Sequence, residues 1–136
     1  MAANPVFASA DLLASAAIAN TANANHDGTG TLSTLFTGTN GLAQRIDAIG
    51  VNAAAAAAVT TQGKIRFFIS TDGGATKRKL GELNVPPLTP SATVSGFSDV
   101  FYPPRPIAVP DNQTIIYAAT NQAEAFAAQV YGSKFA

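Results

Sequence analysis

The sequence predicts an all-β fold: a single sandwich or jelly-roll-like domain of about eight short strands with an extended N-terminal arm. Short segments of alternating apolar and polar residues recur along the chain, which is typical of half-buried strands. Gly- and Pro-containing turn signals separate these segments about every 8–12 residues, a spacing that favours β-sandwiches and jelly rolls. No period of about 20–50 residues repeats, so a solenoid is excluded.

The first 25 residues form the predicted arm, and residues 26–136 form the predicted β-sandwich domain. The opening stretch consists mainly of Ala, Ser, Asn and Thr. Alanine favours a helix and Ser9 or Asp11 could cap one, so a short helix is the alternative. The Asn-Thr-Ala-Asn-Ala-Asn tract at 20–25 is poor helix sequence. We therefore expect an extended arm that leads into a strand.

Strands and turns alternate through the rest of the chain. In the clearest strand, 64–70, Ile65 and Phe67 face one side, while Lys64 and Arg66 face the other. The alanine run at 54–61 is predicted as a strand end plus loop, because so short a helix is marginal. The predicted strands are residues 31–37, 45–53, 64–70, 77–85, 93–101, 114–120 and 124–131. The predicted tight turns are residues 27–30, 38–41 and 72–74, and the prolines confine residues 103–110 to a loop or a sheet edge.

Composition excludes several classes of function. Eight cations balance eight acids, and charged residues make up only 12% of the chain, so it lacks the bulk charge of a general nucleic-acid binder. With no cysteine, disulfides, zinc–thiolate sites and thiol nucleophiles are impossible. No apolar run reaches about 18 residues, which predicts no membrane-spanning helix. No cation precedes Arg45, so we expect no secretory signal.

The expected hydrophobic core is thin. Hydrophobic residues make up 47% of the chain, but 28 of them are alanines. Full burial of a large apolar side chain contributes only about 1.5–3 kcal/mol, whereas ordering a chain costs on the order of 100–200 kcal/mol per hundred residues. A thin core and zero net charge both favour association with further copies or with a partner surface.

No motif indicates an enzyme, a metal site or a cofactor. His26 is the only histidine, and the Gly-x-Ser-x-Gly nucleophile pattern is missing. The loop 27–31 contains one acid, whereas a calcium loop needs several acidic ligands at alternate positions. The remaining acids are scattered singly, so no carboxylate pair of the kind that cleaves glycosides is indicated.

Five of the eight cations are concentrated on one predicted hairpin. They are Lys64, Arg66, Lys77, Arg78 and Lys79. Between the first and the last of them the only acid is Asp72. The simpler interpretation is a solvated hairpin face whose lysines protect the sheet edge. The functional interpretation is a docking patch for the acidic surface of another protein. Nucleic acid is disfavoured because Phe68 is the only aromatic residue on that face.

Four blocks of sequence, taken in order, resemble a known family. They are Asp27-Gly28-Thr29-Gly30-Thr31 with Phe36-Thr37, Asn40-Gly41 and Arg45-Ile46-Asp47; Lys64-Ile65-Arg66-Phe67-Phe68-Ile69 with Asp72-Gly73; Thr89-Pro90-Ser91-Ala92-Thr93-Val94; and Thr120-Asn121 with Ala123-Glu124-Ala125-Phe126. This ordered set resembles a family of small, mostly uncharacterised proteins of tailed bacteriophages, which accompany capsid and other virion structural proteins. The resemblance covers residues 27–135, and the chain departs from the pattern at 54–58 and 103–106.

The resemblance implies a non-enzymatic virion structural protein, foremost a capsid decoration (cement) protein. Such proteins are commonly small β-rich domains that assemble as trimers over capsomer junctions. The implied partners are the major capsid protein or another virion protein, and further copies of the chain. The implied location is the capsid surface of the virion, after synthesis in the host cytoplasm. The family supplies no catalytic residues.

The predicted arm adds candidate partner contacts. Its residues Pro5, Val6 and Phe7 could add a strand to a neighbour or lie in a groove on the shell. The alternative function is a tail, neck or fibre component that acts as a protein- or carbohydrate-binding module. With no Trp and three Tyr, the chain offers few aromatic platforms for sugars.

Overall fold

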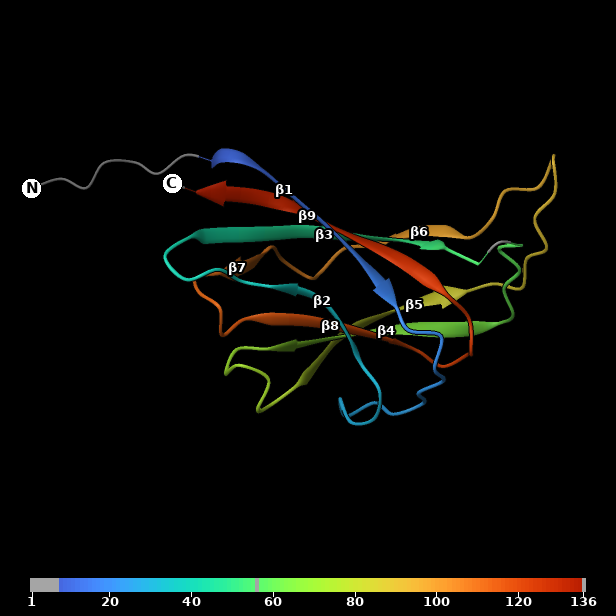
Figure 1. The fold of residues 1–136 in the computed structure, drawn as a ribbon, viewed down its shortest axis with the longest axis horizontal. Helices are drawn as coiled ribbons and strands as arrows, with labels where there is room; N and C mark the ends of the chain where they lie inside the picture. The colour runs from blue at the N-terminus through green and yellow to red at the C-terminus, as the bar shows by residue number, and fades with distance from the viewer. Residues whose placement is uncertain (1–7, 56, 136) are drawn as a thin grey trace, which may run out of the picture.

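Two antiparallel sheets lie face to face in the computed structural model, which describes residues 8–55 and 57–135 (Figure 1). The strands are β1 (Ala8–Ile18), β2 (Ser33–Thr37), β3 (Ala43–Ala53), β4 (Gly63–Ser70), β5 (Arg78–Val85), β6 (Ser98–Phe101), β7 (Ile107–Val109), β8 (Ile115–Thr120) and β9 (Phe126–Phe135). The first sheet has the order β1-β9-β3-β6, with β7 also paired to β3, and the second has the order β2-β8-β4-β5. The predicted all-β sandwich is confirmed.

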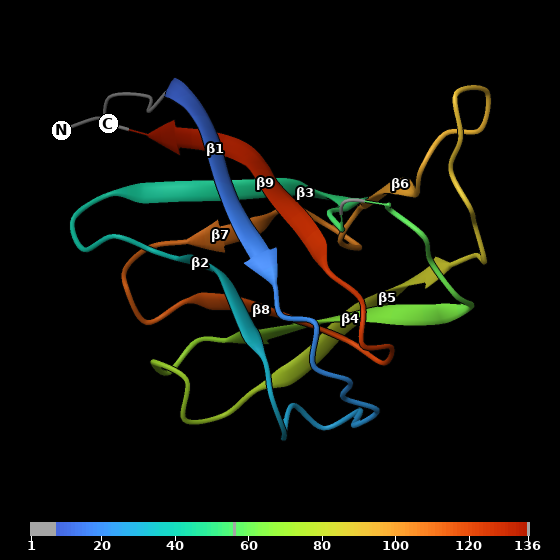
Figure 2. The ribbon, with the colours of Figure 1, turned by 45° about the vertical axis from the view of Figure 1, so that its right-hand side comes forward.

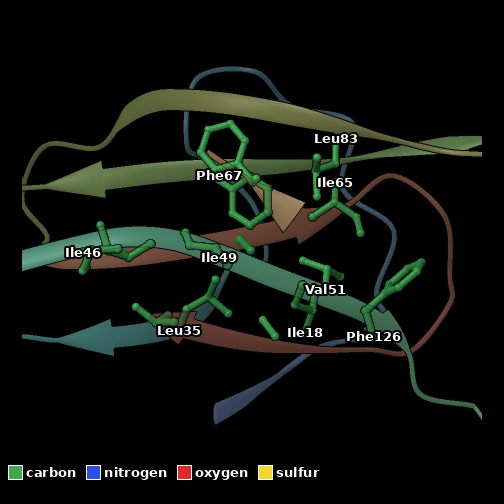
Figure 3. Close-up of a cluster of buried hydrophobic side chains, with 14 of the residues drawn as sticks. Ile18, Leu35, Ile46, Ile49, Val51, Ile65, Phe67, Leu83 and Phe126 are labelled. Atoms are coloured by element: carbon green, nitrogen blue, oxygen red, sulfur yellow. The ribbon is translucent and has the colours of Figure 1, made fainter. Parts of the chain in front are cut away.

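Apolar side chains from both sheets fill the space between them (Figure 3). Their inward positions follow the two-residue period of a strand, as Ile65 and Phe67 of β4 show with no exposed surface. Phe67 stacks on Phe101 of β6, with ring centroids 4.6 Å apart and planes 13° apart. This aromatic pair therefore connects the second sheet to the first.

Part of the predicted arm forms the edge of the first sheet. Strand β1 pairs with β9 along its whole length (Figure 2), with Leu12 opposite Gly132 and Ile18 opposite Phe126. Leu12 and Ile18 are buried at the core, because they occupy alternate positions on the inward face. Residues 8–18 are therefore extended and not helical, and they belong to the sandwich. The candidate contacts Pro5, Val6 and Phe7 lie outside the described residues.

The expected solvated hairpin face is covered in part: Arg66 and Phe68 of β4 are buried, whereas Arg78 and Lys79 on the edge strand β5 are exposed. After β1 the chain crosses to the second sheet, and residues 19–32 run over its outer side (Figure 2). The backbone N–H of Asn23 donates to the carbonyl of the last residue of β8 over 2.9 Å. Gly28, at a φ of +84°, lies against Phe68 of β4. This cover leaves Phe68 fully buried, and Arg66 on the same strand is only 6% exposed.

The remaining strands lie close to their expected positions. The main difference is in the predicted strand 93–101, of which only the last four residues form β6. In the proline-rich stretch, β7 has three residues between Pro106 and Pro110 and pairs with β3. The predicted turns are present, with positive φ at Gly41 (76°) and Gly73 (73°). No helix within the described part of the chain is long and apolar enough to cross a membrane.

Candidate functional site

Glu82 of β5 brings together three of the five predicted hairpin cations. Its partner in the antiparallel register is Arg66 of β4, whose Nε lies 3.4 Å from Glu82 Oε1. Lys64 Nζ lies 3.5 Å from Glu82 Oε2, and Lys79 Nζ donates a hydrogen bond to Oε1. Residues of one strand face recur at every second position, so Lys64 and Arg66 reach the same carboxylate. We call these four residues the Glu82 cluster.

The Glu82 cluster has more positive than negative charge. The hydrogen bond from Lys79, with the attraction of the three cations, outweighs desolvation and lowers the pKa of Glu82 from 4.5 to about 2. Glu82 is therefore ionised at neutral pH, yet it balances only one of the three cations. His26 Nδ1 lies 3.5 Å from Glu82 Oε1 and 3.0 Å from Lys79 Nζ. An anion that approaches this cluster meets two uncompensated positive charges.

Arg66 is the least exposed member of the cluster, at 6% of its surface. Its Nε and Nη1 are shielded from solvent, and neither makes a hydrogen bond. A buried guanidinium normally has its N–H groups satisfied, because an unsatisfied buried donor costs about 1–3 kcal/mol or more. The interaction with Glu82 is thus an ion pair without hydrogen-bond geometry, and donor capacity is left unused.

An open groove of about 890 Å³ runs beside the cluster at one end of the second sheet. The residues that line it are Gln62, Gly63, Lys64, Arg66, Asn84, Val85, Pro86, Pro87 and Asn121. Lys64 Nζ donates to Asn84 Oδ1 over 2.7 Å, and Asn121 Oδ1 accepts from the backbone N–H of Lys64 over 2.7 Å. None of these lining residues is aromatic. The groove wall therefore offers cations and amides and no ring for stacking.

The other two predicted cations lie away from the groove. Lys77 Nζ is 5.3 Å from the centre of the Tyr117 ring and donates to the carbonyl of Gly74 over 3.0 Å. Arg78 lines a smaller hollow together with Asp72. The predicted basic patch thus divides into the Glu82 cluster and two separate cations. The sequence pattern did not indicate Glu82 as a partner of these cations, because Glu82 lies after the segment 64–79 that contains them.

A second candidate surface is the outer face of the first sheet. Strand register places three adjacent rows of uncharged side chains there, and a fourth row, next to Leu13 and Tyr131, contains Asp11, Ser133 and Arg45. The three uncharged rows consist of Leu13, Ser15 and Ala17 on β1; Ala127, Gln129 and Tyr131 on β9; Ala48, Gly50 and Asn52 on β3; and Ser98 and Val100 on β6. We call these eleven residues the uncharged face. A hydrogen bond of 3.3 Å from Asn52 Nδ2 to Gln129 Oε1 joins two of its strands.

The uncharged face exposes large apolar groups among small ones. Leu13 is 65% exposed, Tyr131 43% and Val100 37%. The Tyr131 ring lies over Gly50, at 3.1 Å from the point where a Cβ of that residue would be. Beside the face, β1 ends the first sheet, and its described residues have one charge, Asp11, and no proline. Charged residues and prolines are the usual protection of a free strand edge, so β1 is poorly protected.

Neither surface has the residues of a metal centre. Across the described ranges, no group of three or more His, Cys, Asp or Glu side chains is arranged to hold a metal ion. The uncharged face was not predicted from the sequence, because β1 was expected to be an arm. The signal that could have identified it is the alternation in residues 12–18, where Leu12 and Ile18 face the core and Leu13, Ser15 and Ala17 face outward.

Comparison with known proteins gives one structural match. No family model matches the chain, and no curated protein does. The solved structure of the CBM22-1 and GH10 modules of Clostridium thermocellum N-terminal endo-1,4-β-D-xylanase 10B, complexed with xylohexaose, has 12% sequence identity and a TM-score of 0.36. The match covers 92% of this chain and 25% of that chain. A likeness at this level carries no conclusion about what this chain binds.

Proposed function

We propose that this protein is a non-enzymatic structural protein of a phage virion, a capsid decoration (cement) protein that binds the outer shell as an oligomer and stabilises it. The uncharged face is the observation that supports this proposal. Burying a charged group against a partner costs several kcal/mol unless the charge is well paired. A sheet face that presents Leu13, Tyr131 and small neutral side chains can be buried against protein without that cost.

The size of the face explains why an oligomer would be needed. A stable protein interface uses about 20–30 residues on each side, and the uncharged face provides eleven. One copy would therefore bind the shell weakly. Linked copies that contact several sites at once gain avidity without new contacts. The trimer that the family resemblance implies would supply such linkage, and the open edge of β1 is available for contacts between copies.

Stabilisation of the shell would follow from mass action. A ligand that binds only the assembled state favours assembly by RT ln(1 + [L]/Kd), which is about 2.7 kcal/mol at a concentration of 100 Kd. No catalytic step is needed. This agrees with the lack of a catalytic motif in the sequence.

A second candidate function is a carbohydrate-binding module on a tail, neck or fibre. The groove favours it, because the amides of Gln62, Asn84 and Asn121 line the wall and amides can donate to and accept from sugar hydroxyls. The lack of an aromatic ring in that lining argues against it. A glycan array separates the two, since specific low-micromolar binding of one sugar class would favour the second candidate.

Binding of purified protein to phage shells that lack it tests the first proposal. Leu13→Glu places a charge at the most exposed apolar residue of the uncharged face, and we expect copies bound per shell to fall about tenfold or more, because the charge must be desolvated. Val94→Glu is the matched control, since Val94 is 45% exposed in a loop outside the face. Equal binding of the Leu13 and Val94 variants, or no binding of the unaltered protein, contradicts the proposal.

A further inference from the structure

We propose that the groove beside the Glu82 cluster binds the carboxylates of an acidic peptide segment on a partner protein. This inference concerns the second sheet, whereas the proposed shell contact uses the first. It does not rest on the proposed function, and it is tested on the isolated protein. Failure of either proposal therefore leaves the other standing.

The first argument is the buried positive charge of Arg66 in the groove wall. The residue is 6% exposed and lines the groove, and its Nε and Nη1 make no hydrogen bond. Within the described residues, the one carboxylate that contacts Arg66 is that of Glu82, at 3.4 Å. Because Nε and Nη1 are shielded from solvent, Arg66 would attract a second carboxylate, bound at Lys64, through its positive charge.

The second argument is charge. Lys64, Arg66 and Lys79 surround a single carboxylate, which leaves an excess of two positive charges in the cluster. Two of these cations, Lys64 and Arg66, line the groove. Lys64 is the accessible member, with its side chain 44% exposed. Glu82 itself demonstrates that a carboxylate fits among these cations, because its two oxygens are shared between Lys64 and Arg66. An incoming carboxylate would meet Lys64 Nζ from the solvent side.

The third argument concerns the class of ligand. The volume of about 890 Å³ is within the range of about 300–1,000 Å³ usual for ligand sites. The lining contains no aromatic ring, although stacking on such rings is the main device for binding sugars and single-stranded nucleic acids. The wall instead presents Pro86, Pro87 and amides, which suit an extended peptide. The combination of cations, amides and prolines favours an acidic peptide over an acidic sugar.

The test is a titration of the full chain with a fluorescein-labelled hexaglutamate peptide, followed by fluorescence anisotropy and by amide chemical shifts. We expect saturable binding that weakens as salt rises, with shift changes at Gln62, Asn84 and Asn121. Lys64→Gln should weaken binding about tenfold, the usual effect of losing one charge-assisted hydrogen bond. Arg105→Gln is the control for net charge, because Arg105 is exposed and outside the groove, and it should bind like the unaltered protein.

Glu82→Gln gives a result of opposite sign. It removes the internal competitor for the three cations, so hexaglutamate should bind about tenfold more tightly. A purely structural role for the cluster predicts no such gain. Thermal unfolding of each variant establishes that it is folded before binding is compared.

Three results overturn the proposal. The first is the absence of shift changes in the groove at millimolar hexaglutamate, and the second is equal binding by the Lys64 and Arg105 variants. The third is preference for another anion. Tighter binding of hexagalacturonate would assign the groove to an acidic polysaccharide, and binding of inorganic phosphate without peptide would assign it to phosphate groups.

Discussion

Tyr131 of β9 lies directly opposite Leu13 of β1, and both side chains are exposed on the outer face of the first sheet, by 43% and 65%. Cross-strand neighbours of this kind usually stabilise a sheet by contact with each other. Here they also present apolar surface at one end of the eleven uncharged positions. The inward neighbours Leu12 and Val130 are buried. The same two strands therefore form the core on one side and the proposed docking surface on the other.

The contact between the two sheets depends on Phe67. Its ring is fully buried and stacks on Phe101 across the sandwich. Phe67→Ala would leave a cavity in a thin core, and we expect a loss of about 3–5 kcal/mol in the free energy of unfolding. Tyr102→Ala, at a residue that is 71% exposed, should change it by less than about 0.5 kcal/mol. Chemical denaturation measures both, and similar losses would contradict the assigned core.

Gly132 allows β9 to approach β3 closely. A Cβ at this position would clash with the backbone carbonyl of Arg45, next to the irregularity in register between Ile46 and Ala48. Gly132→Ala should therefore destabilise the protein by about 3 kcal/mol or more, because backbone cannot move aside cheaply. Gly96→Ala is the control, since the nearest atom to its added Cβ lies at 3.5 Å. If the melting temperature falls no more for Gly132→Ala than for Gly96→Ala, then β9 and β3 lie farther apart at Gly132 than the structure places them.

Asn23 holds the segment that covers the second sheet. Its Nδ2 donates to the carbonyls of Thr29 and Thr31 over 3.0 and 2.9 Å, and its Oδ1 accepts from the backbone of Asn25 over 3.0 Å. Asn23→Ala leaves these groups without their partner, so we expect a loss of about 1–3 kcal/mol and faster amide exchange in residues 19–32. Asn112→Ala, at an exposed position, should have little effect. Unchanged exchange after Asn23→Ala would mean that this segment is held by other contacts.

The Glu82 cluster makes stability depend on pH. The pKa of Glu82 is lowered from 4.5 to about 2, chiefly by the hydrogen bond from Lys79. A lowered pKa in the folded state contributes stability that is complete above about pH 4.5 and is lost as pH falls toward 2. We expect Glu82 to contribute about 1 kcal/mol at neutral pH, after allowing for solvent screening of a side chain that is 21% exposed.

Glu82→Gln should accordingly flatten the pH dependence of unfolding between about pH 4.5 and 2. Asp72 titrates in the same range, because its pKa is lowered to about 2 by hydrogen bonds from the backbone of Thr76 and from Ser70. Asp72 is present in both the unaltered protein and the Glu82→Gln variant. The difference between their free energies of unfolding at each pH therefore isolates the contribution of Glu82. If that difference stays constant from pH 7 to pH 2, the cluster does not stabilise the folded state.

Much of the fold could be predicted from the sequence because strands leave local signals. The alternation in 64–70 and the turns at Gly41 and Gly73 follow from side-chain period and from glycine conformation. Strand β1 was harder, because Leu12 and Ile18 are separated mainly by alanines and serines. Its role as a sheet strand depends on pairing with β9, which is more than a hundred residues away in the sequence.

The candidate site was less predictable for the same reason. The sequence indicated which cations gather on the hairpin, and the register then placed Glu82 opposite Arg66. That register depends on the irregularity between Phe67 and Phe68, which no local pattern indicates. The cover over Phe68 depends on residues 19–32 crossing to the second sheet, a tertiary arrangement that strand periodicity does not encode.

Cryo-electron microscopy of the intact phage particle tests the central claim most directly. The proposed function predicts this chain on the outer capsid surface, in a copy number near that of the major capsid protein, with Leu13 and Tyr131 against the shell. A few copies at the tail, neck or fibre would contradict that function. So would a decoration layer in which the outer face of β1, β9 and β3 points to solvent.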